Sequence, residues 1–367
     1  MSSQALFSPV KVGANTLKHR VVLAPLTRFR ATLDHIPTDV QVEYYKQRAS
    51  DGGLLISEGT AISRLAGAYP QVPGIYNTEQ IEGWKKVTSA VHAKGGLIFV
   101  QLWHIGRAGS KDRNPNQEQV VGPSDIPCPG KDFTGIDYEQ PRALTVDEIK
   151  AVINDFAQAA KNAIEAGFDG VELHGANGFL IDQFINSSSN QRTDIYGGSS
   201  ENRARFALEV VDAVVQAVGA ERTAIRFSPG GEFQGMGDDN AENTWGYLTA
   251  ELQKNHPDLA YLHMIESRSN IFADSQTGLV DTLEPYRKLF KGPFITAGGF
   301  SNAQEFAEEI AEKTGDLIAY GRAFIANPDL PERLRNGWEL NPYDRNTFYT
   351  NGVEGYTDYP FYNSVKK

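Results

Sequence analysis

The feature that most constrains the fold of this 367-residue chain is a regular alternation of short apolar runs with helical patterns. The runs are mostly continuous rather than alternating, as expected of parallel strands that are buried on both faces. Helical patterns follow them along nearly the whole chain. The predicted strands are Val21–Ala24, Leu54–Ser57, Ile98–Leu102, Gly170–Leu173, Ala224–Phe227, Tyr261–Met264, Phe294–Thr296 and Leu317–Tyr320.

The clearest helix is predicted over Thr145–Ala166, where apolar residues recur at spacings of three and four and so form one stripe. Thr145 and Glu148 match a capping box at its start, and Gly167 stands where a helix-terminating glycine is expected. Further helices are predicted at Asp39–Ala49, Glu79–Lys94, Glu201–Val218, Glu242–Asn255, Asn302–Lys313 and Asp329–Asn336.

A strand followed by a helix, repeated eight times, predicts an α/β fold of the (β/α)8 TIM-barrel type. A doubly wound sheet is the rival, but no G-x-G-x-x-G follows the first strand. Because the repeats use most of the chain, we expect a single domain over residues 1–367. Phe7–Lys18 predicts a hairpin that forms an N-terminal lid over the bottom of the barrel. The Pro- and Gly-rich segment His104–Arg142 predicts a long, functional loop after the third strand.

Charge and cysteine content exclude several classes of protein. The chain has 35 Lys and Arg against 46 Asp and Glu, a net charge of −11, which argues against nucleic acid or an anionic membrane as its main partner. No secretory signal and no apolar run of about 18 residues is visible, so we expect a cytoplasmic protein. The single cysteine, Cys128, excludes an internal disulfide and any site built from several cysteines, and we expect no metal.

In a barrel, residues just after the strands at their carboxyl ends build the site. Gly298 and Gly299 follow the seventh predicted strand, and Gly321 and Arg322 follow the eighth. Backbone N–H groups and a guanidinium at this place suit a phosphate. Tight turns would use the same glycines without any ligand.

Polar residues also end the other strands. His174 and Asn177 could donate two hydrogen bonds to a carbonyl or phenolate oxygen, which would polarise an enone, or they could be a structural histidine and a turn residue. Arg226 needs an anionic partner when buried, either a reduced flavin or a loop carboxylate. Thr27 and Gln101 could bind a ring edge or be satisfied within the core.

The chain resembles the old yellow enzyme family along nearly its full length and in the same order. The similar motifs are Ala24-Pro25-Leu26-Thr27-Arg28, Tyr44-Tyr45-x-Gln47-Arg48-Ala49, Gln101-Leu102-Trp103 with Gly106-Arg107, His174-Gly-Ala-Asn177-Gly178 with Asp182-Gln183-Phe184, Asn190-x-Arg192-Thr193-Asp194 with Tyr196-Gly197-Gly198 and Glu201-Asn202-Arg203, and Gly321-Arg322 with Asn327-Pro328-Asp329-Leu330. That family is an FMN-dependent (β/α)8 barrel that reduces activated alkenes with NADPH or NADH. The resemblance therefore implies FMN as cofactor and an α,β-unsaturated carbonyl compound as small-molecule substrate.

The resemblance also implies a role for each matching residue. Thr27 would bind flavin O4, Gln101 and Arg226 the pyrimidine edge, and Gly299 and Arg322 the phosphate, with Pro25 and Gly59 packing nearby. His174 and Asn177 would hold the activating oxygen of the substrate while hydride arrives from flavin N5. The residues expected to shape the substrate pocket are Tyr69, Trp103, Phe233, Phe272 and Tyr349.

One position departs from the family pattern. After Asn177-Gly178 the family carries a tyrosine that protonates the substrate, whereas this chain has Phe179. Losing a positioned acid costs about 10²–10⁴ in rate. Tyr349, Tyr69 or water could supply the proton, reduction could be confined to strongly activated alkenes, or the hydride could return in a redox-neutral isomerisation, as in fungal family members of secondary metabolism. A neutral replacement of Tyr by Phe is the remaining interpretation.

Two other classes are less consistent with the sequence. An aldolase or lyase would need a Schiff-base lysine at a strand end, and none of the predicted ends carries one. A barrel kept only for binding would be expected to lose the polar strand-end residues, which are present. The sequence leaves open NADPH against NADH, and a monomer against a homodimer.

Overall fold

The strands close into a barrel. The computed structural model describes residues 5–67, 69–132, 135–267 and 280–362. Within these ranges, eight parallel strands form a closed barrel in the order β10, β11, β12, β3, β4, β5, β8 and β9. They are β3 (Val21–Leu23), β4 (Leu54–Ala61), β5 (Leu97–Trp103), β8 (Gly170–Gly175), β9 (Thr223–Phe227), β10 (Tyr261–Ile265), β11 (Phe294–Ala297) and β12 (Leu317–Tyr320). Each matches a predicted strand, so the (β/α)8 TIM barrel is confirmed.

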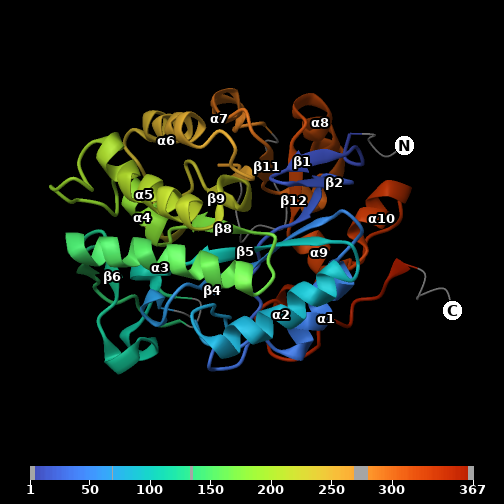
Figure 1. The fold of residues 1–367 in the computed structure, drawn as a ribbon, viewed down its shortest axis with the longest axis horizontal. Coiled ribbons are helices and arrows are strands. Elements are labelled where there is room, and N and C mark those ends of the chain that lie inside the picture. The colour runs from blue at the N-terminus through green and yellow to red at the C-terminus, as the bar shows by residue number, and fades with distance from the viewer. Residues whose placement is uncertain (1–4, 68, 133–134, 268–279, 363–367) are drawn as a thin grey trace.

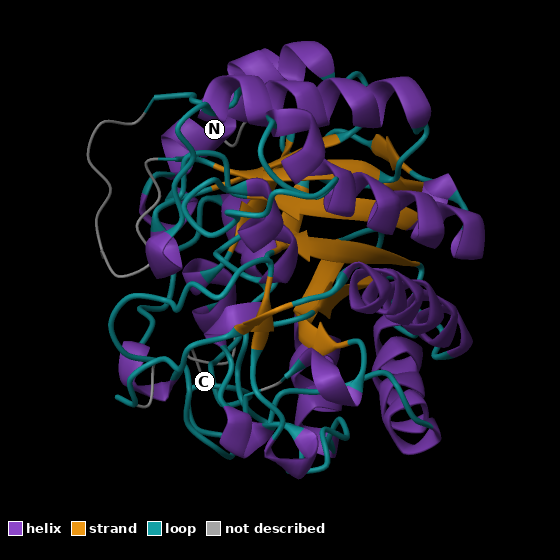
Figure 2. Cartoon of the chain, turned by 90° about the vertical axis from the view of Figure 1, so that its left-hand side faces the viewer, coloured by secondary structure: helices purple, strands orange, loops and turns teal. Residues whose placement is uncertain are grey.

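Helices surround the strands on the outside of the barrel, as Figure 2 shows in purple and orange. The helices anticipated from the sequence are α1 (Asp39–Arg48), α2 (Thr78–His92), α3 (Val146–Glu165), α5 (Ser200–Val218), α6 (Ala241–Asn255), α8 (Gln304–Thr314) and α10 (Leu330–Asn336). The sequence missed α4 (Leu180–Ile185), α7 (Glu284–Leu289) and α9 (Arg322–Ala326). Five or six residues are too few to show a helical period. None of the described helices is long and apolar enough to cross a membrane.

The capping box predicted for α3 is present. The backbone N–H of Glu148 donates to the Thr145 hydroxyl oxygen at 3.2 Å, and the N–H of Thr145 donates to the Glu148 carboxylate at 2.8 Å. These bonds satisfy two of the donors that a helix start leaves unpaired. The helix therefore begins where the sequence predicts.

The N-terminal hairpin covers the end of the barrel at which the strands begin, and lies beside β11 and β12 in Figure 1. Its strands β1 (Val10–Val12) and β2 (Asn15–Leu17) pair antiparallel and pack against barrel-strand residues such as Leu54 and Tyr261. Gly13 turns with a φ of +54°, and a Cβ there would lie 2.0 Å from the carbonyl oxygen of Glu221. The hairpin lid is thus confirmed, and its glycine is required by both backbone angle and space.

Strand β4 is longer than predicted because it contains a bulge. Its pairing with β5 shifts between Ile56 and Gly59, so that Glu58 lies out of the regular ladder. The Glu58 carboxylate accepts hydrogen bonds from Gln41 at 2.8 Å and Tyr45 at 3.4 Å, both on α1. Burial raises the pKa of Glu58 to about 7. A carboxylate within an apolar strand explains why the sequence pattern ended early.

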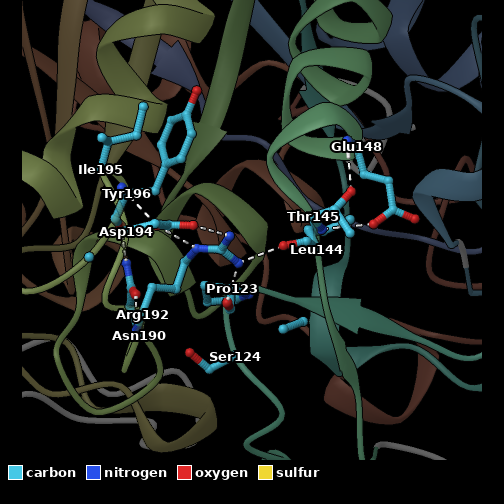
Figure 3. Close-up of polar contacts among 12 residues, drawn as sticks. Pro123, Ser124, Leu144, Thr145, Glu148, Asn190, Arg192, Asp194, Ile195 and Tyr196 are labelled. Atoms are coloured by element: carbon cyan, nitrogen blue, oxygen red, sulfur yellow. Dashed lines mark hydrogen bonds and ion pairs between the residues drawn. The ribbon is translucent and has the colours of Figure 1, made fainter.

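The long loop after β5 carries the two-residue strand β6 (Val121–Gly122), which pairs with β7 (Arg142–Ala143) just before α3. Arg192, which lies between α4 and α5, binds both ends of this segment, as Figure 3 shows. Its guanidinium donates to the carbonyl oxygens of Pro123 at 2.8 Å and Leu144 at 2.6 Å. It also donates to both carboxylate oxygens of Asp194, at 3.1 and 2.6 Å.

Arg203 makes a similar connection at the start of α5. Its guanidinium donates to the carbonyl oxygens of Ile185 at 2.9 Å and Gly198 at 2.6 Å, and to Asp238 at 2.7 Å. We call Arg192 and Arg203 the staple arginines. The most specific motif that the sequence shares with the old yellow enzyme family is thus explained by structural bonds between loops.

Candidate active site

Strand register brings the predicted polar residues to one end of the barrel. Gly59 on β4 lies opposite Gln101 on β5, and Gln101 lies opposite Glu172 on β8. Arg226 on β9 is flanked by His174 on β8 and by a histidine on β10, His263. Glu172 and His263 were not predicted as site residues, because their contact joins residues 91 positions apart and depends on how the strands are arranged in the barrel.

A hydrogen-bonded cluster fills the barrel beneath this end. The Gln101 amide nitrogen donates to one oxygen of Glu172 at 2.8 Å, and His263 Nδ1 lies 2.8 Å from the other oxygen. The side chains of Glu172 and His263 are fully buried. We call Gln101, Glu172, Arg226 and His263 the barrel cluster.

Charges in the barrel cluster balance. Burial lowers the pKa of Arg226, an effect that the Glu172 carboxylate opposes, and the guanidinium stays charged. Burial alone would raise the pKa of Glu172, but contacts with His263, Arg226 and Gln101 outweigh it and the pKa is lowered. Burial also lowers the pKa of His263, which is therefore a neutral donor. The cluster thus holds one positive and one negative charge.

His174 is neutral as well. Burial, together with the positive charge of Arg226, holds the pKa of His174 well below its usual range. A neutral imidazole can donate one hydrogen bond to a ligand without adding a charge to the site.

Several buried polar atoms at this end lack partners. In the described part of the chain, no hydrogen-bond partner is found for His174 Nδ1, Arg226 Nε or Trp103 Nε1. Native proteins rarely leave such groups unsatisfied, so orphaned donors gathered at one place indicate a ligand site. The unpartnered donor of Arg226 suits the pyrimidine edge of a flavin, which carries negative charge when the flavin is reduced.

The loop after β8 is held by a buried carboxylate that sequence reasoning did not assign. Asn177 has a φ of +58°, and its N–H donates to the Ser228 hydroxyl at 2.9 Å. Ser228 donates to Asp182 at 3.3 Å, and the N–H of Gly178 donates to the same carboxylate at 2.8 Å. Asp182 stands in a motif quoted above, but its burial on the short helix α4 could not be read from the sequence. These bonds fix the backbone from which Asn177 projects.

Aromatic rings connect most of the predicted pocket residues. Phe179 packs edge-on against His174, at 5.0 Å between ring centroids, and against Trp103 at 4.9 Å. Tyr69 lies 5.6 Å from Trp103, and Phe29, which was not predicted, bridges Tyr69 at 6.3 Å and Tyr349 at 5.5 Å. The row reaches the surface at Tyr349, which is 61% exposed.

Another predicted pocket residue, Phe233, lies on the loop after β9. Phe233 is half-buried in a short turn (Phe233–Gly235) whose backbone approaches Gly178, where a Cβ would lie 2.9 Å from the Phe233 carbonyl oxygen. Phe272 lies outside the described residues.

The loops after β11 and β12 meet, as a phosphate site requires. Gly298 and Gly299 have φ angles of +134° and +76°, and the N–H of Ala323 donates to the Ser301 hydroxyl at 3.0 Å. Arg322 donates to the Tyr343 hydroxyl at 3.4 Å and remains half-buried. Gly321 approaches the loop after β3, where a Cβ would lie 3.3 Å from Leu26. Pro25 and Thr27 flank Leu26, so the first and last strands bring these predicted residues to the same sector.

Two arginines after β3 hold the C-terminal segment 347–356, which carries Tyr349. Arg28 donates to the carbonyl oxygens of Phe348 at 3.0 Å and Gly355 at 2.8 Å. Arg30 donates to the carbonyl oxygen of Phe348 at 3.0 Å and to that of Thr347 at 3.1 Å. Sequence reasoning gave these arginines no role, because the carbonyl groups that they bind lie more than 300 residues away.

Among the described residues, no group of three or more His, Cys, Asp or Glu side chains is arranged to hold a metal ion. The site is therefore characterised by single donors from many strands.

Comparison with known proteins agrees with this arrangement. Residues 5–341 match the model of the NADH:flavin oxidoreductase / NADH oxidase family. Flavin oxidoreductase hxnT of Emericella nidulans is 48% identical, over 98% of each chain. The 12-oxophytodienoate reductase 1 of Oryza sativa subsp. japonica is 49% identical, over 98% of this chain and 94% of that protein. The structure of morphinone reductase in complex with tetrahydroNAD superposes with a TM-score of 0.90, at 45% identity and 99% coverage of both chains.

Proposed function

Because the chain belongs to the NADH:flavin oxidoreductase / NADH oxidase family, of old yellow enzyme type, it is an FMN-dependent NAD(P)H oxidoreductase, and we propose that it reduces the activated C=C bond of α,β-unsaturated carbonyl compounds. The observation that carries the proposal is the neutral imidazole of His174, whose Nδ1 has no hydrogen-bond partner among the described residues and which lies three residues before Asn177. Two neutral donors at one place suit an uncharged carbonyl oxygen.

The strand-end residues would hold the cofactor. Gln101 and Arg226 would bind the pyrimidine edge of FMN, and Thr27 its O4. The remaining contacts would come from Pro25, Gly59, Gly298, Gly299, Gly321 and Arg322, and the last four of these would bind the phosphate. When bound, FMN supplies the two-electron transfer between NAD(P)H and the substrate.

His174 and Asn177 would orient and polarise the substrate. Hydrogen bonds to the carbonyl oxygen draw electron density from the conjugated C=C bond and stabilise negative charge that develops on that oxygen. The bonds through Ser228 and Asp182 keep the Asn177 backbone fixed, so little reorganisation is needed during reaction. Trp103 and Tyr69 would exclude water from the substrate side.

Phe179 has no proton to give, and its ring fills the space between Trp103 and His174. Burial holds the pKa of Tyr69 well above its usual range, and its hydroxyl donates to the carbonyl oxygen of Ala108 at 3.3 Å. Tyr69 is therefore a weak acid. We propose that the proton comes from water that enters beside the exposed Tyr349.

The absence of an acidic group on Phe179 also favours a second candidate function, a redox-neutral alkene isomerase. Without a nearby acid, an enolate held by His174 and Asn177 would persist, and return of the hydride would give a rearranged alkene with no net use of NAD(P)H. The two candidates differ in stoichiometry. Reduction consumes one NAD(P)H per product, whereas isomerisation proceeds with a catalytic amount.

The decisive experiment is anaerobic product analysis with a panel of cyclic enones, at catalytic and at stoichiometric NADPH or NADH. We expect saturated product equal to the coenzyme consumed. Conversion sustained by catalytic coenzyme would support the isomerase instead. Purified protein that is colourless and takes up no FMN would contradict both.

Phe179→Tyr tests the role of the missing acid. We expect turnover in enone reduction to rise by about 10²-fold, the lower end of what a positioned acid contributes. Phe361→Tyr, which adds a hydroxyl at an exposed position near the C-terminus, is the matched control and should leave turnover unchanged. Equal products and rates for wild type and Phe179→Tyr would mean that residue 179 does not control the outcome.

A further inference from the structure

One fully buried acid in the barrel has no role in the reaction described above. Glu172 lies beneath the strand ends, and both of its oxygens are occupied, one by Gln101 and the other by His263. A buried carboxylate is costly unless its hydrogen bonds and its charge are both compensated. Here neutral donors satisfy the hydrogen bonds, and the remaining charge acts on Arg226.

The bond from Gln101 also determines which way its amide faces. Because the amide nitrogen donates to Glu172, the side-chain carbonyl oxygen is the atom left for a ligand. The uracil-like edge of a flavin offers an N–H group that needs such an acceptor. Glu172 thus orients a ligand-binding group without touching the ligand itself.

Charge balance gives Glu172 a second effect. Reduced flavin carries negative charge near its pyrimidine edge, whereas oxidised flavin is neutral there. A lone Arg226 would strongly favour the reduced form. With Glu172 ionised and His263 neutral, this preference is moderated.

We propose that Glu172 is a positioning residue that orients Gln101, balances the charge of Arg226, and so limits how much more tightly the site binds reduced than oxidised FMN. The inference rests on the proposed flavin contacts of Gln101 and Arg226. It predicts a redox property of the cofactor rather than a rate.

The test is the midpoint potential of bound FMN in Glu172→Gln, measured by anaerobic reduction against a reference dye. Removing the carboxylate charge should raise the preference for reduced over oxidised FMN at least tenfold. For a two-electron couple this corresponds to an upward shift of about 30 mV or more. Glu209→Gln is the matched control. It removes one carboxylate on α5 that accepts a bond from Tyr196 at 2.7 Å, and should leave the potential unchanged.

The outcomes separate this inference from the proposed flavin site. If substitution of Gln101 or Arg226 leaves the FMN affinity of the protein unchanged, the proposed flavin site is wrong. An intact site with the same potential in Glu172→Gln as in wild type would overturn only the present inference.

A second variant covers the case in which Glu172→Gln does not fold. Removing one partner of a buried charge pair is strongly destabilising, whereas replacing both is often neutral. The double variant Glu172→Gln/Arg226→Gln should therefore regain a cooperative unfolding transition. A double variant that is no more stable than the single one would contradict charge balance between Glu172 and Arg226.

Discussion

Arg226 and Arg192 are both largely buried, yet their surroundings differ. Every guanidinium nitrogen of Arg192 donates a hydrogen bond, to two loop carbonyl groups and to Asp194. Arg226 Nε, by contrast, has no partner among the described residues, and the same holds for His174 Nδ1 and Trp103 Nε1. Bonded donors stabilise the fold, whereas orphaned donors cost stability unless a ligand completes them. The comparison separates residues that hold the barrel together from residues that bind.

The largest expected effect is on stability and concerns Arg192, the arginine whose donors are all bonded. Arg192→Ala leaves the Asp194 carboxylate without its cation and removes the donors to Pro123 and Leu144. We expect the free energy of unfolding to fall by about 3–5 kcal/mol, because four hydrogen bonds from a charged donor are lost. Urea denaturation measures this, and the folded fraction should keep its FMN affinity. If Arg192→Ala kept normal stability but lost FMN binding, Arg192 would be a binding residue rather than a structural one.

The second-largest expected effect concerns His174, one of the residues assigned to ligand binding. His174→Gln removes a side chain whose Nδ1 has no described partner, so the free energy of unfolding should change by about 1 kcal/mol or less. Turnover in enone reduction should fall by about 10²–10³-fold, because a donor to the developing oxyanion is lost. Steady-state kinetics alongside urea denaturation tests both parts. A large loss of stability with unchanged turnover would make His174 structural.

Glu58 extends the comparison, because it accepts hydrogen bonds but forms no salt bridge with any residue that the structure describes. Its pKa is about 7 in the folded protein against an ordinary value of 4.5, so the folded state holds the proton more tightly. Stability should therefore decline as pH rises from about 4.5 to about 7, by roughly 3 kcal/mol. Glu58→Gln should remove this decline, as urea denaturation at pH 5 and pH 8 would reveal. An equal pH dependence in both proteins would contradict it.

The sequence predicted the barrel well, because eight buried strands leave continuous apolar runs and α3 carries its own capping box. It also predicted which strand ends carry polar residues, such as Gln101 and Arg226. It missed Glu172 and His263, because the contact between them depends on the register of strands that lie some 90 residues apart in the sequence. It likewise missed Phe29, Arg28 and Arg30, whose partners lie in distant segments. Long-range pairing, rather than local pattern, determines these contacts.

The measurement that tests the account most directly is FMN binding to apoprotein, followed by flavin fluorescence quenching, for wild type, Gln101→Ala and Arg192→Ala. The account predicts that Gln101→Ala weakens FMN binding at least tenfold. Folded Arg192→Ala should bind FMN as wild type does, despite its lower stability. Unchanged affinity in Gln101→Ala, with weakened affinity in folded Arg192→Ala, would contradict the distinction between the strand-end residues proposed to bind FMN and the staple arginines.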